Sequence, residues 1–325
     1  LQKKVIDDLE LRKHGFHVYT MNPGRIHLFP GGQSIRFWHD AEKCAGEIRK
    51  ILAPDAAAWL RWVEFWNRAM RVFSEYYLTP PPSLDELRAA FRERDEEELL
   101  DTLLTVPLKD IIERHFESPL IRAMVCAGGG DQGDITEQGS AYSSAFFKFA
   151  GFRQDKENYG IVRGGMGGIS QAMARSAEAS GASIRTNAEV KRILAEDGRV
   201  TGVELVDGEI LSSDCVLSNA DPKRTFCKLL DSTALDDAFV ADVESLQTNA
   251  ASVKLHCALN KLPDLSKYLG STFEPKDIAL MTICPSVEYY QASWEDAKNG
   301  RVSRSPLIQA QIPTVYDPTV AKQGQ

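Results

Sequence analysis

The chain has 325 residues, of which 43% are hydrophobic, so it is long enough to bury one large core or two ordinary ones. Its formal net charge of -8 leaves no basic surface suited to nucleic acid or to an anionic membrane. The sequence also lacks a run of about 18 apolar residues, the length at which a bilayer-spanning helix is expected.

Six cysteines are spread along the sequence without a Cys-x-x-Cys pair: Cys44, Cys126, Cys215, Cys227, Cys257 and Cys284. Because several lie in apolar runs, we expect buried free thiols in a reducing compartment rather than disulfides. The cysteines and histidines also lack the spacing of metal ligands, so we predict no metal site. Such a compartment is the cytoplasm for a bacterial protein, and the mitochondrial matrix is an alternative for a eukaryotic one.

The N-terminal part combines a short helix, a small sheet and a long helical region. Residues 1–13 have the pattern of the end of an amphipathic helix, and Gly15 is a stop signal just beyond it. Short alternating runs then predict a small antiparallel sheet, with strands at 16–19, 26–29 and 34–38. Residues from about 40 to 91 are predicted to be helical.

An aromatic stripe marks the middle of this helical region. Its residues recur at three- and four-residue steps, as on one face of a helix: Trp59, Trp62, Val63, Trp66, Met70 and Phe73. Such stripes usually pack into a core, which is the interpretation we favour. A helix covering a hydrophobic substrate cavity is the first alternative. A membrane-surface helix ranks third, because the opposite face lacks a lysine-rich band.

Residues 128–133 match the dinucleotide pattern G-x-G-x-x-G after the apolar run 121–127. A dinucleotide site needs a strand before this pattern and a helix that starts inside it. Asp131, Asp134 and Glu137 would also repel a phosphate, since they carry like charge. We therefore favour a flexible loop, with a nicotinamide site as the alternative.

A second glycine cluster, at 164–168, lies between a predicted strand and a predicted helix. Residues 159–163 predict a strand, and 169–180 predict a helix that Gly181 ends. The start of a helix offers unpaired N–H donors, and missing side chains let a flat or anionic ligand approach the backbone. A tight strand-to-helix turn without a ligand is the alternative.

A meander is predicted after this helix. Asp197-Gly198 and Asp207-Gly208 are strong hairpin signals, and they separate strands at 190–196, 200–206 and 209–211. The apolar residues 215–218 predict a returning strand buried on both faces of a parallel sheet. Two extended runs joined through a helix indicate a right-handed crossover and an α/β fold.

The C-terminal part is predicted to contain further strands at 252–259, 279–284 and 307–312, with a helix over 286–298. His256 is interpreted as a structural histidine. Three aromatic residues of the helix fit either a cavity lining or helix packing: Tyr289, Tyr290 and Trp294.

The central segments share a family pattern. Its motifs are Gly164-Gly165-Met166-Gly167-Gly168-Ile169, Gly181-Ala182-Ser183-Ile184, Asp197-Gly198-Arg199-Val200-Thr201-Gly202-Val203 and Val216-Leu217-Ser218-Asn219-Ala220-Asp221-Pro222. These motifs resemble the phytoene desaturase-like flavoproteins, which are relatives of the flavin amine oxidases. Residues 8–15 and 304–318 resemble one branch, the pyridine nucleotide-disulfide oxidoreductase domain-containing proteins, so the similarity spans nearly the whole chain.

The resemblance implies an α/β protein in two parts. A partial FAD-binding, Rossmann-like domain with a β-meander would cover 159–232. A mixed sheet-and-helix, α+β substrate domain would cover 1–158, with a helical insertion, and 233–325. The family's N-terminal G-x-G-x-x-G unit and its C-terminal flavin segment are missing here, so the chain resembles an internal fragment of a longer flavoprotein.

FAD is the cofactor that the resemblance implies. The cofactor-binding residues carried over by position are Gly164, Gly165, Met166, Gly167, Val190, Ser218, Asn219 and Ala220. Val190 matches a residue whose backbone contacts the adenine, and 218–220 match a strand end near the cofactor. The glycines match the turn that opens the crossover helix at the domain junction.

The implied activity is a flavin-dependent oxidoreductase that takes a hydride from a C–H bond of a hydrophobic substrate. Its partners would be that small substrate and an unidentified electron acceptor, and a homo-oligomer is left open. No residue stands out as a catalytic acid or base. The alternative is a non-catalytic interaction or regulatory protein that keeps the flavoprotein fold.

Overall fold

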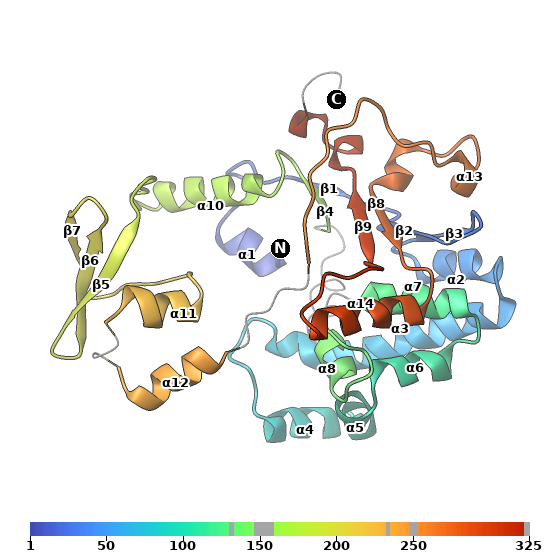
Figure 1. The fold of residues 1–325 in the computed structure, drawn as a ribbon, viewed down its shortest axis with the longest axis horizontal. Helices are drawn as coiled ribbons and strands as arrows, with labels where there is room; N and C mark the ends of the chain where they lie inside the picture. Colours follow the sequence, from blue (N-terminus) through green and yellow to red (C-terminus); the bar gives the residue numbers. More distant parts are fainter. Residues whose placement is uncertain (130–132, 146–158, 232–234, 247–251, 322–325) are drawn as a thin grey trace. The chain divides into compact units, whose positions relative to one another are not determined.

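The computed structural model describes residues 1–129, 133–145, 159–231, 235–246 and 252–321 (Figure 1). The chain divides into two compact units. Unit 1 comprises Leu1–Ser176 and His256–Gln325, and unit 2 comprises Ala177–Leu255. The predicted domain limits at 158/159 and 232/233 differ from these divisions and stay a prediction.

Unit 1 begins with a short helix, α1 (Lys3–Asp8), which is shorter than the predicted 1–13. It ends early because Glu10 adopts a left-handed conformation (φ 47°), which turns the fully buried Leu11 back toward the helix. Gly15, also left-handed at φ 88°, follows as the predicted stop.

The first strand, β1 (Val18–Thr20), pairs antiparallel with β4 (Gly160–Val162), with Val18 opposite Val162. The prediction that it joins the next two strands in one sheet was therefore wrong. Those strands, β2 (Arg25–Leu28) and β3 (Ser34–Phe37), do form the predicted antiparallel hairpin. Alternation predicts that a strand exists, but it does not predict which partner the strand takes.

The main sheet of unit 1 has the strand order β3-β2-β8-β9. The strands β8 (Leu280–Ile283) and β9 (Ile308–Gln311) confirm two predicted strands, and β8 pairs parallel with β2. One face of this sheet buries an apolar cluster: Ile26, Leu28, Ile278 and Met281. Phe29, Ile35 and Cys284 instead join the helical core.

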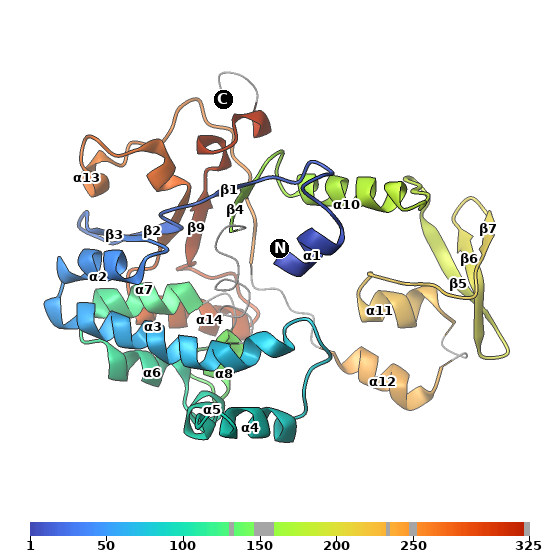
Figure 2. The ribbon, with the colours of Figure 1, turned by 180° about the vertical axis from the view of Figure 1, so that it is seen from behind.

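Helices gather beside this sheet (Figure 2). Their bounds are α2 (Ala41–Arg49), α3 (Ala53–Phe73), α4 (Leu84–Arg92), α5 (Glu97–Thr105), α6 (Leu108–His115), α7 (Pro119–Gly129), α8 (Ser140–Ser144) and α14 (Val287–Lys298). The described part of unit 1 also contains short helices and 3-10 turns: η1 (Ser74–Tyr76), α13 (Ser266–Leu269), η7 (Pro275–Ile278), η8 (Pro313–Val315) and η9 (Pro318–Val320). The predicted helices over 40–91 and 286–298 are thereby confirmed.

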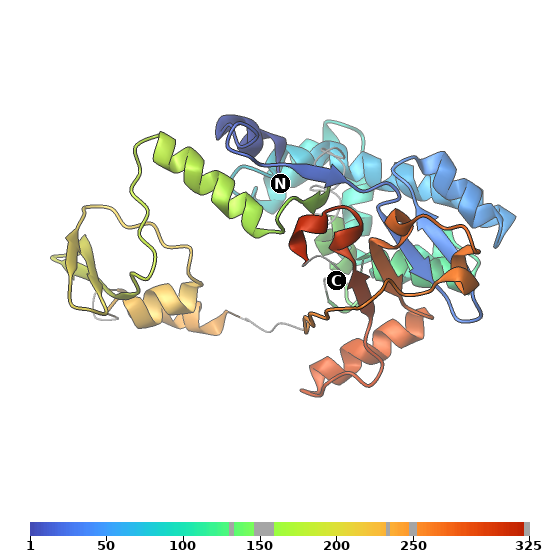
Figure 3. The same ribbon diagram turned by 90° about the horizontal axis from the view of Figure 1, so that it is seen from above.

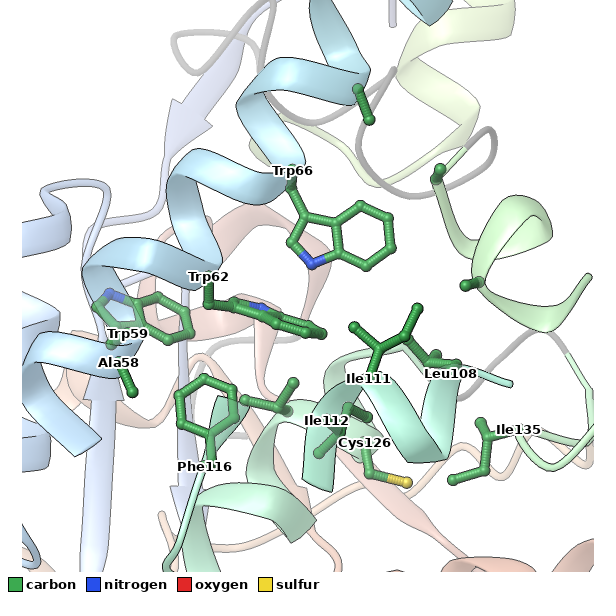
Figure 4. Packing of buried hydrophobic residues seen from close by; sticks show 14 of the residues in the cluster. Ala58, Trp59, Trp62, Trp66, Leu108, Ile111, Ile112, Phe116, Cys126 and Ile135 are labelled. Carbon is green, nitrogen blue, oxygen red and sulfur yellow. The ribbon is translucent and has the colours of Figure 1, made fainter. Parts of the chain in front are cut away.

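The aromatic stripe lies in the core of this helical layer (Figure 4). Trp66 is fully buried, and its ring lies 5.3 Å from that of Trp62 in an edge-to-face arrangement. Trp62 in turn contacts Phe116, with ring centroids 5.5 Å apart. Edge-to-face pairs align the positive ring edge with the negative ring face, which favours this geometry. The packing interpretation of the stripe is confirmed.

The nicotinamide alternative was wrong. Residues 121–127, which a dinucleotide site would need as a strand, belong to helix α7. Gly128 lies in the same helix, where an added Cβ would come within 2.7 Å of the Arg25 guanidinium. The loop expected beyond it includes residues 130–132, which lie outside the described residues.

Unit 2 contains the predicted meander, with β5 (Val190–Glu196), β6 (Arg199–Leu205) and β7 (Ile210–Ser212) in the order β5-β6-β7. Asp197 (φ 50°) and Gly198 (φ 73°) are both left-handed, as a two-residue hairpin turn of this twist requires. Three helical segments follow: α11 (Pro222–Arg224), the π-helical turn η5 (Thr225–Leu229) and α12 (Asp237–Ser245).

Two predicted strands, 215–218 and 252–259, are wrong: both segments are irregular and largely exposed. Leu217 is 94% exposed, and Cys215 and Cys257 are exposed thiols rather than buried ones. A strand must hydrogen bond its backbone to a neighbour, and no described strand pairs with either segment. Within the described residues, the predicted parallel crossover through 215–218 is therefore not formed. His256 is exposed as well.

Candidate cofactor site at the glycine turn

The second glycine cluster forms the turn between strand β4 and helix α10 (Gly167–Ala179). Gly164 and Gly165 are both left-handed, at φ 76° and 78°, a conformation that side chains other than glycine rarely adopt. A Cβ on Gly168 would come within 2.5 Å of the Arg163 carbonyl oxygen. The glycines are thus needed for the tight entry into the helix, as predicted.

The start of α10 is held by α1 and β1. Val162 and Ala172 are buried in one cluster with Ile6, Leu11, Phe16 and Val18. The Arg175 guanidinium donates to the His14 carbonyl oxygen at 2.8 Å, and the Ser176 hydroxyl donates to the Leu9 carbonyl oxygen at 2.7 Å. These contacts fix the position of the helix, and therefore of the turn, within unit 1.

Most backbone N–H groups of the turn have partners. Gly165 donates to the Val162 carbonyl oxygen at 2.9 Å, Gly168 to Gly165 at 3.0 Å, and Ile169 to Met166 at 3.1 Å. Among the described residues, the N–H groups of Met166 and Gly167 have no hydrogen-bond partner. The turn therefore presents two consecutive free donors at the start of a helix.

Nothing in unit 1 crowds these donors. A Cβ built on Gly164, Gly165 or Gly167 would meet no atom within 4 Å, and Met166 is 71% exposed. Adjacent N–H groups at a helix N-terminus suit an acceptor oxygen, because they add the helix dipole to direct hydrogen bonding. The arrangement can bind a carbonyl or phosphate oxygen of a ligand that approaches the backbone.

The Gly164 N–H is already occupied. It donates to the Asp317 carboxylate at 2.6 Å, across 153 positions of the sequence. Figure 3 shows the C-terminal turns that carry this residue beside the start of α10. Of the predicted site residues, Gly164 is therefore a structural donor here, whereas Met166 and Gly167 have free donors.

Asp317 is fully buried, and its second carboxylate oxygen accepts from the Thr319 N–H at 3.1 Å and from its hydroxyl at 2.7 Å. Burial raises the pKa of this carboxyl, but the hydrogen bonds from Thr319 and Gly164 outweigh burial and hold the pKa below its usual value. Sequence analysis missed its contact with the turn. Asp-Pro-Thr is a recognisable helix-start signal, but it indicates the local cap alone.

The remaining predicted residues lie in unit 2. Val190 is the first residue of β5 and is opposite Leu205. The Ser218 hydroxyl shares a 2.8 Å hydrogen bond with the Thr225 hydroxyl. An ion pair of 3.7 Å between Glu189 and Arg224 joins the start of β5 to the helix that follows 218–220.

Within unit 2, the start of β5 is thus joined to the helical segment that follows Ser218, Asn219 and Ala220. The Ala220 N–H donates to the Ser218 hydroxyl at 3.3 Å, and its carbonyl oxygen accepts from the Thr225 hydroxyl at 3.4 Å. Ser218 and Asn219 are exposed. The predicted residues are therefore divided between the two units, and their role in cofactor binding stays a prediction.

Comparison with known proteins relates the chain to a family. Over residues 5–316 the chain matches the sequence model of the family described as flavin containing amine oxidoreductase. It is 28% identical over 359 residues to mouse (Mus musculus) pyridine nucleotide-disulfide oxidoreductase domain-containing protein 2, covering 100% of this chain and 61% of that protein. The chain thus spans about three fifths of the length of that relative.

A bacterial relative matches a smaller part. The neurosporene-forming phytoene desaturase of Cereibacter sphaeroides is 30% identical over 161 residues, covering 50% of this chain and 29% of that protein. A crystal structure of an oxidoreductase from Methanosarcina mazei, 24% identical, covers 51% of this chain and 41% of its own, with a TM-score of 0.34. That score is too low to support a statement about the fold.

Across the described parts of both units, no helix combines the length and apolar character needed to cross a bilayer. The mixed α/β architecture with several small sheets, the glycine turn and the match over nearly the whole sequence agree with the predicted resemblance. The chain belongs to the flavin-containing amine oxidoreductase family.

Proposed function

We propose that this chain is part of an FAD-dependent oxidoreductase that removes a hydride from a C–H bond of a small hydrophobic substrate. Family membership over residues 5–316 supports flavin chemistry. The names of relatives such as a phytoene desaturase and a hydroxyneurosporene desaturase support a hydrophobic substrate and a desaturase, dehydrogenase or oxidase reaction. Bound FAD supplies the hydride acceptor, and the protein binds, orients and shields the reactants.

The open glycine turn is the observation that carries this proposal. It fits the cofactor because a ligand can reach the backbone past Gly164, Gly165 and Gly167 without meeting a side chain. The free N–H groups of Met166 and Gly167 would then donate to an acceptor oxygen of the cofactor. Val190, Ser218, Asn219 and Ala220 are proposed to serve its adenine side.

We also propose that other contacts to the cofactor lie outside this chain. The mouse relative has 39% of its length beyond the matched part, as 61% is covered. The domain division into 1–158, 159–232 and 233–325, with a partial Rossmann-like FAD domain in the middle, belongs to the same proposal.

Removal of one free donor tests the role of the turn. Gly167 is the first residue of α10, a position at which proline is well tolerated, so Gly167→Pro deletes the N–H and keeps the helix start. We expect at least tenfold weaker FAD binding, measured by quenching of flavin fluorescence. Asp237→Pro makes the same change at the first residue of α12 and should leave FAD binding unchanged.

A second measurement decides between catalysis and the non-catalytic alternative. The protein, expressed with any flanking coding sequence, should carry a yellow flavin chromophore that bleaches when the flavin is reduced. A colourless protein whose melting temperature does not respond to FAD would contradict the proposal. That outcome would favour an interaction or regulatory protein that has kept the fold.

A further inference from the structure

The contact between Asp317 and the glycine turn has no role in the proposal above. It joins the C-terminal turns of unit 1 to the start of α10, and its carboxylate is fully buried. Both carboxylate oxygens are engaged, one by the Gly164 N–H and the other by the two donors of Thr319. A buried carboxylate with this many donors is a strong and directional anchor.

The turn itself has little else to hold its shape. Gly164 and Gly165 have no side chain to pack, and their left-handed backbone leaves open space where a Cβ would point. Glycine also has the largest conformational freedom to lose when a turn becomes ordered. Among the described residues, Asp317 provides the one side-chain hydrogen bond to residues 164–168.

We propose that Asp317 is a positioning residue that holds the glycine turn in the shape in which Met166 and Gly167 present their free N–H groups together. The expected effect on cofactor binding rests on the proposed function, whereas the contact between Asp317 and the turn does not. Asp317 acts through Gly164 and does not touch the ligand.

The geometry makes asparagine a sharp test. Asp317→Asn keeps the size of the side chain but replaces one acceptor oxygen by an NH₂ group, which is a donor. If the remaining oxygen serves the donors of Thr319, the NH₂ group faces the Gly164 N–H at 2.6 Å, and in the other orientation it faces the Thr319 N–H. Two donors cannot bond to each other, so the variant loses either the bond to the turn or the local cap that supports it.

Asp55 offers a matched control in the same unit. It is also buried, and its two oxygens accept from the N–H groups of Glu117 and Ser118 at 2.8 and 2.9 Å. Asp55→Asn therefore places an NH₂ group against a backbone donor in the same way, at a site whose partners are not in the turn. Any general effect of losing a buried carboxylate appears in both variants.

Two readouts test the proposal, both made on the protein expressed with any flanking coding sequence. We expect Asp317→Asn to raise amide hydrogen exchange at Gly164 and Gly165, whose N–H groups are hydrogen bonded, at least tenfold. It should also weaken FAD binding at least tenfold, with Asp55→Asn changing neither. Unchanged exchange at the turn, or faster exchange with unchanged FAD binding, would overturn the positioning role. Faster exchange in a chain whose unsubstituted form binds no FAD would support the anchor and contradict the proposed function instead.

A milder variant keeps the test decisive if Asp317→Asn does not fold. Thr319→Val removes the hydroxyl donor and keeps the backbone donor, so it should raise exchange at the turn by a smaller factor. Thr319→Ser restores the hydroxyl and should return exchange to the level of the unsubstituted chain. A valine variant with unchanged exchange at the turn would count against the proposal.

Discussion

Units 1 and 2 differ in how much apolar surface they bury. Unit 1 holds a large helical core, in which Trp66, Phe73 and Phe91 are fully buried, and smaller apolar clusters beside it. In the described part of unit 2, the buried apolar side chains are those of Leu205 and Val243. Its exposed large apolar residues are Ile184, Val206, Ile210, Leu211, Leu217, Phe239, Leu246, Val253 and Leu255.

The difference shows that local hydrogen bonding and burial are separate sources of order. Unit 2 keeps paired β-strands, Asp-Gly turns and capped helices. In the cap of α12, for example, the Asp236 side chain accepts from the N–H groups of Ala238 and Phe239. These features are set by residues close in sequence. Stability in water depends mainly on apolar burial, however, and most of that burial is in unit 1.

The largest effect is expected from a substitution in the core of unit 1. Trp66→Ala should lower the free energy of unfolding by about 3–5 kcal/mol, the usual cost of emptying a buried aromatic site. Urea denaturation followed by circular dichroism measures it. Leu217→Ala in unit 2, at a side chain that is 94% exposed, should change stability by no more than about 0.5 kcal/mol. Comparable losses of unfolding free energy in the two variants would contradict the conclusion that apolar burial is concentrated in unit 1.

Acid should act on unit 1 through the buried His27. Burial, with a contribution from the Arg25 charge, lowers the pKa of this histidine from 6.5 to about 4, although the hydrogen bond to the Cys284 carbonyl oxygen raises it. The unfolded chain therefore takes up the proton first, and stability is lost as the pH falls from 6.5 toward 4.

The pKa difference corresponds to about 3 kcal/mol at about 1.4 kcal/mol per unit. His27→Gln removes the titrating group and keeps a donor for the Cys284 carbonyl oxygen. Unfolding free energies of both proteins, measured at several pH values, should converge as the pH is lowered through this range. Parallel curves would show that His27 is not the group responsible.

A glycine in the meander tests unit 2. A Cβ on Gly202 would lie 2.2 Å from the Leu211 carbonyl oxygen on the neighbouring strand, so Gly202→Ala must separate β6 from β7. We expect a local cost of about 1–3 kcal/mol, visible as faster amide exchange in both strands. Gly208→Ala is the control, because this glycine also has a positive φ (91°) but a Cβ there meets nothing within 4 Å, so the variant has backbone strain without a clash against the neighbouring strand. Exchange that stays slow in Gly202→Ala would refute the predicted clash.

The smallest effect concerns a single helix cap in unit 1. The Ser83 hydroxyl accepts from the Glu86 N–H at 3.2 Å, while the Glu86 carboxylate accepts from the Ser83 N–H at 2.7 Å. Ser83→Ala should lower the free energy of unfolding by about 1 kcal/mol, and Ser83→Asp should retain most of it. Denaturation midpoints of the three proteins provide the measurement. No measurable loss in the alanine variant would mean that the cap contributes little.

Features with local causes could be predicted from the sequence. The cap at Ser83, the turn at Asp197-Gly198 and the left-handed glycines 164–165 each depend on residues within a few positions of one another. The pairing of β1 with β4 and of β2 with β8 could not be predicted, because alternation does not identify a distant partner. Segment 215–218 was mistaken for a strand for the same reason.

The candidate site shows the same limit. The sequence predicted a glycine turn at 164–168 that opens a helix, and the structure agrees. Which N–H groups of the turn remain free depends on Asp317, which lies 153 positions away from Gly164. No periodicity or spacing connects residues this far apart, so the free donors of Met166 and Gly167 became visible only in three dimensions.

The parallel pairing of β2 with β8 has a consequence for folding during synthesis on the ribosome. His27 and the Cys284 carbonyl oxygen, which are hydrogen bonded in the finished sheet, are 257 positions apart. At a synthesis rate of about 5–20 residues per second, the N-terminal hairpin waits roughly 10–50 s for its partner strand. Throughout that interval one edge of β2 has unpaired backbone groups, which are a template for pairing with other chains. The nascent chain is therefore expected to need protection by chaperones until β8 emerges.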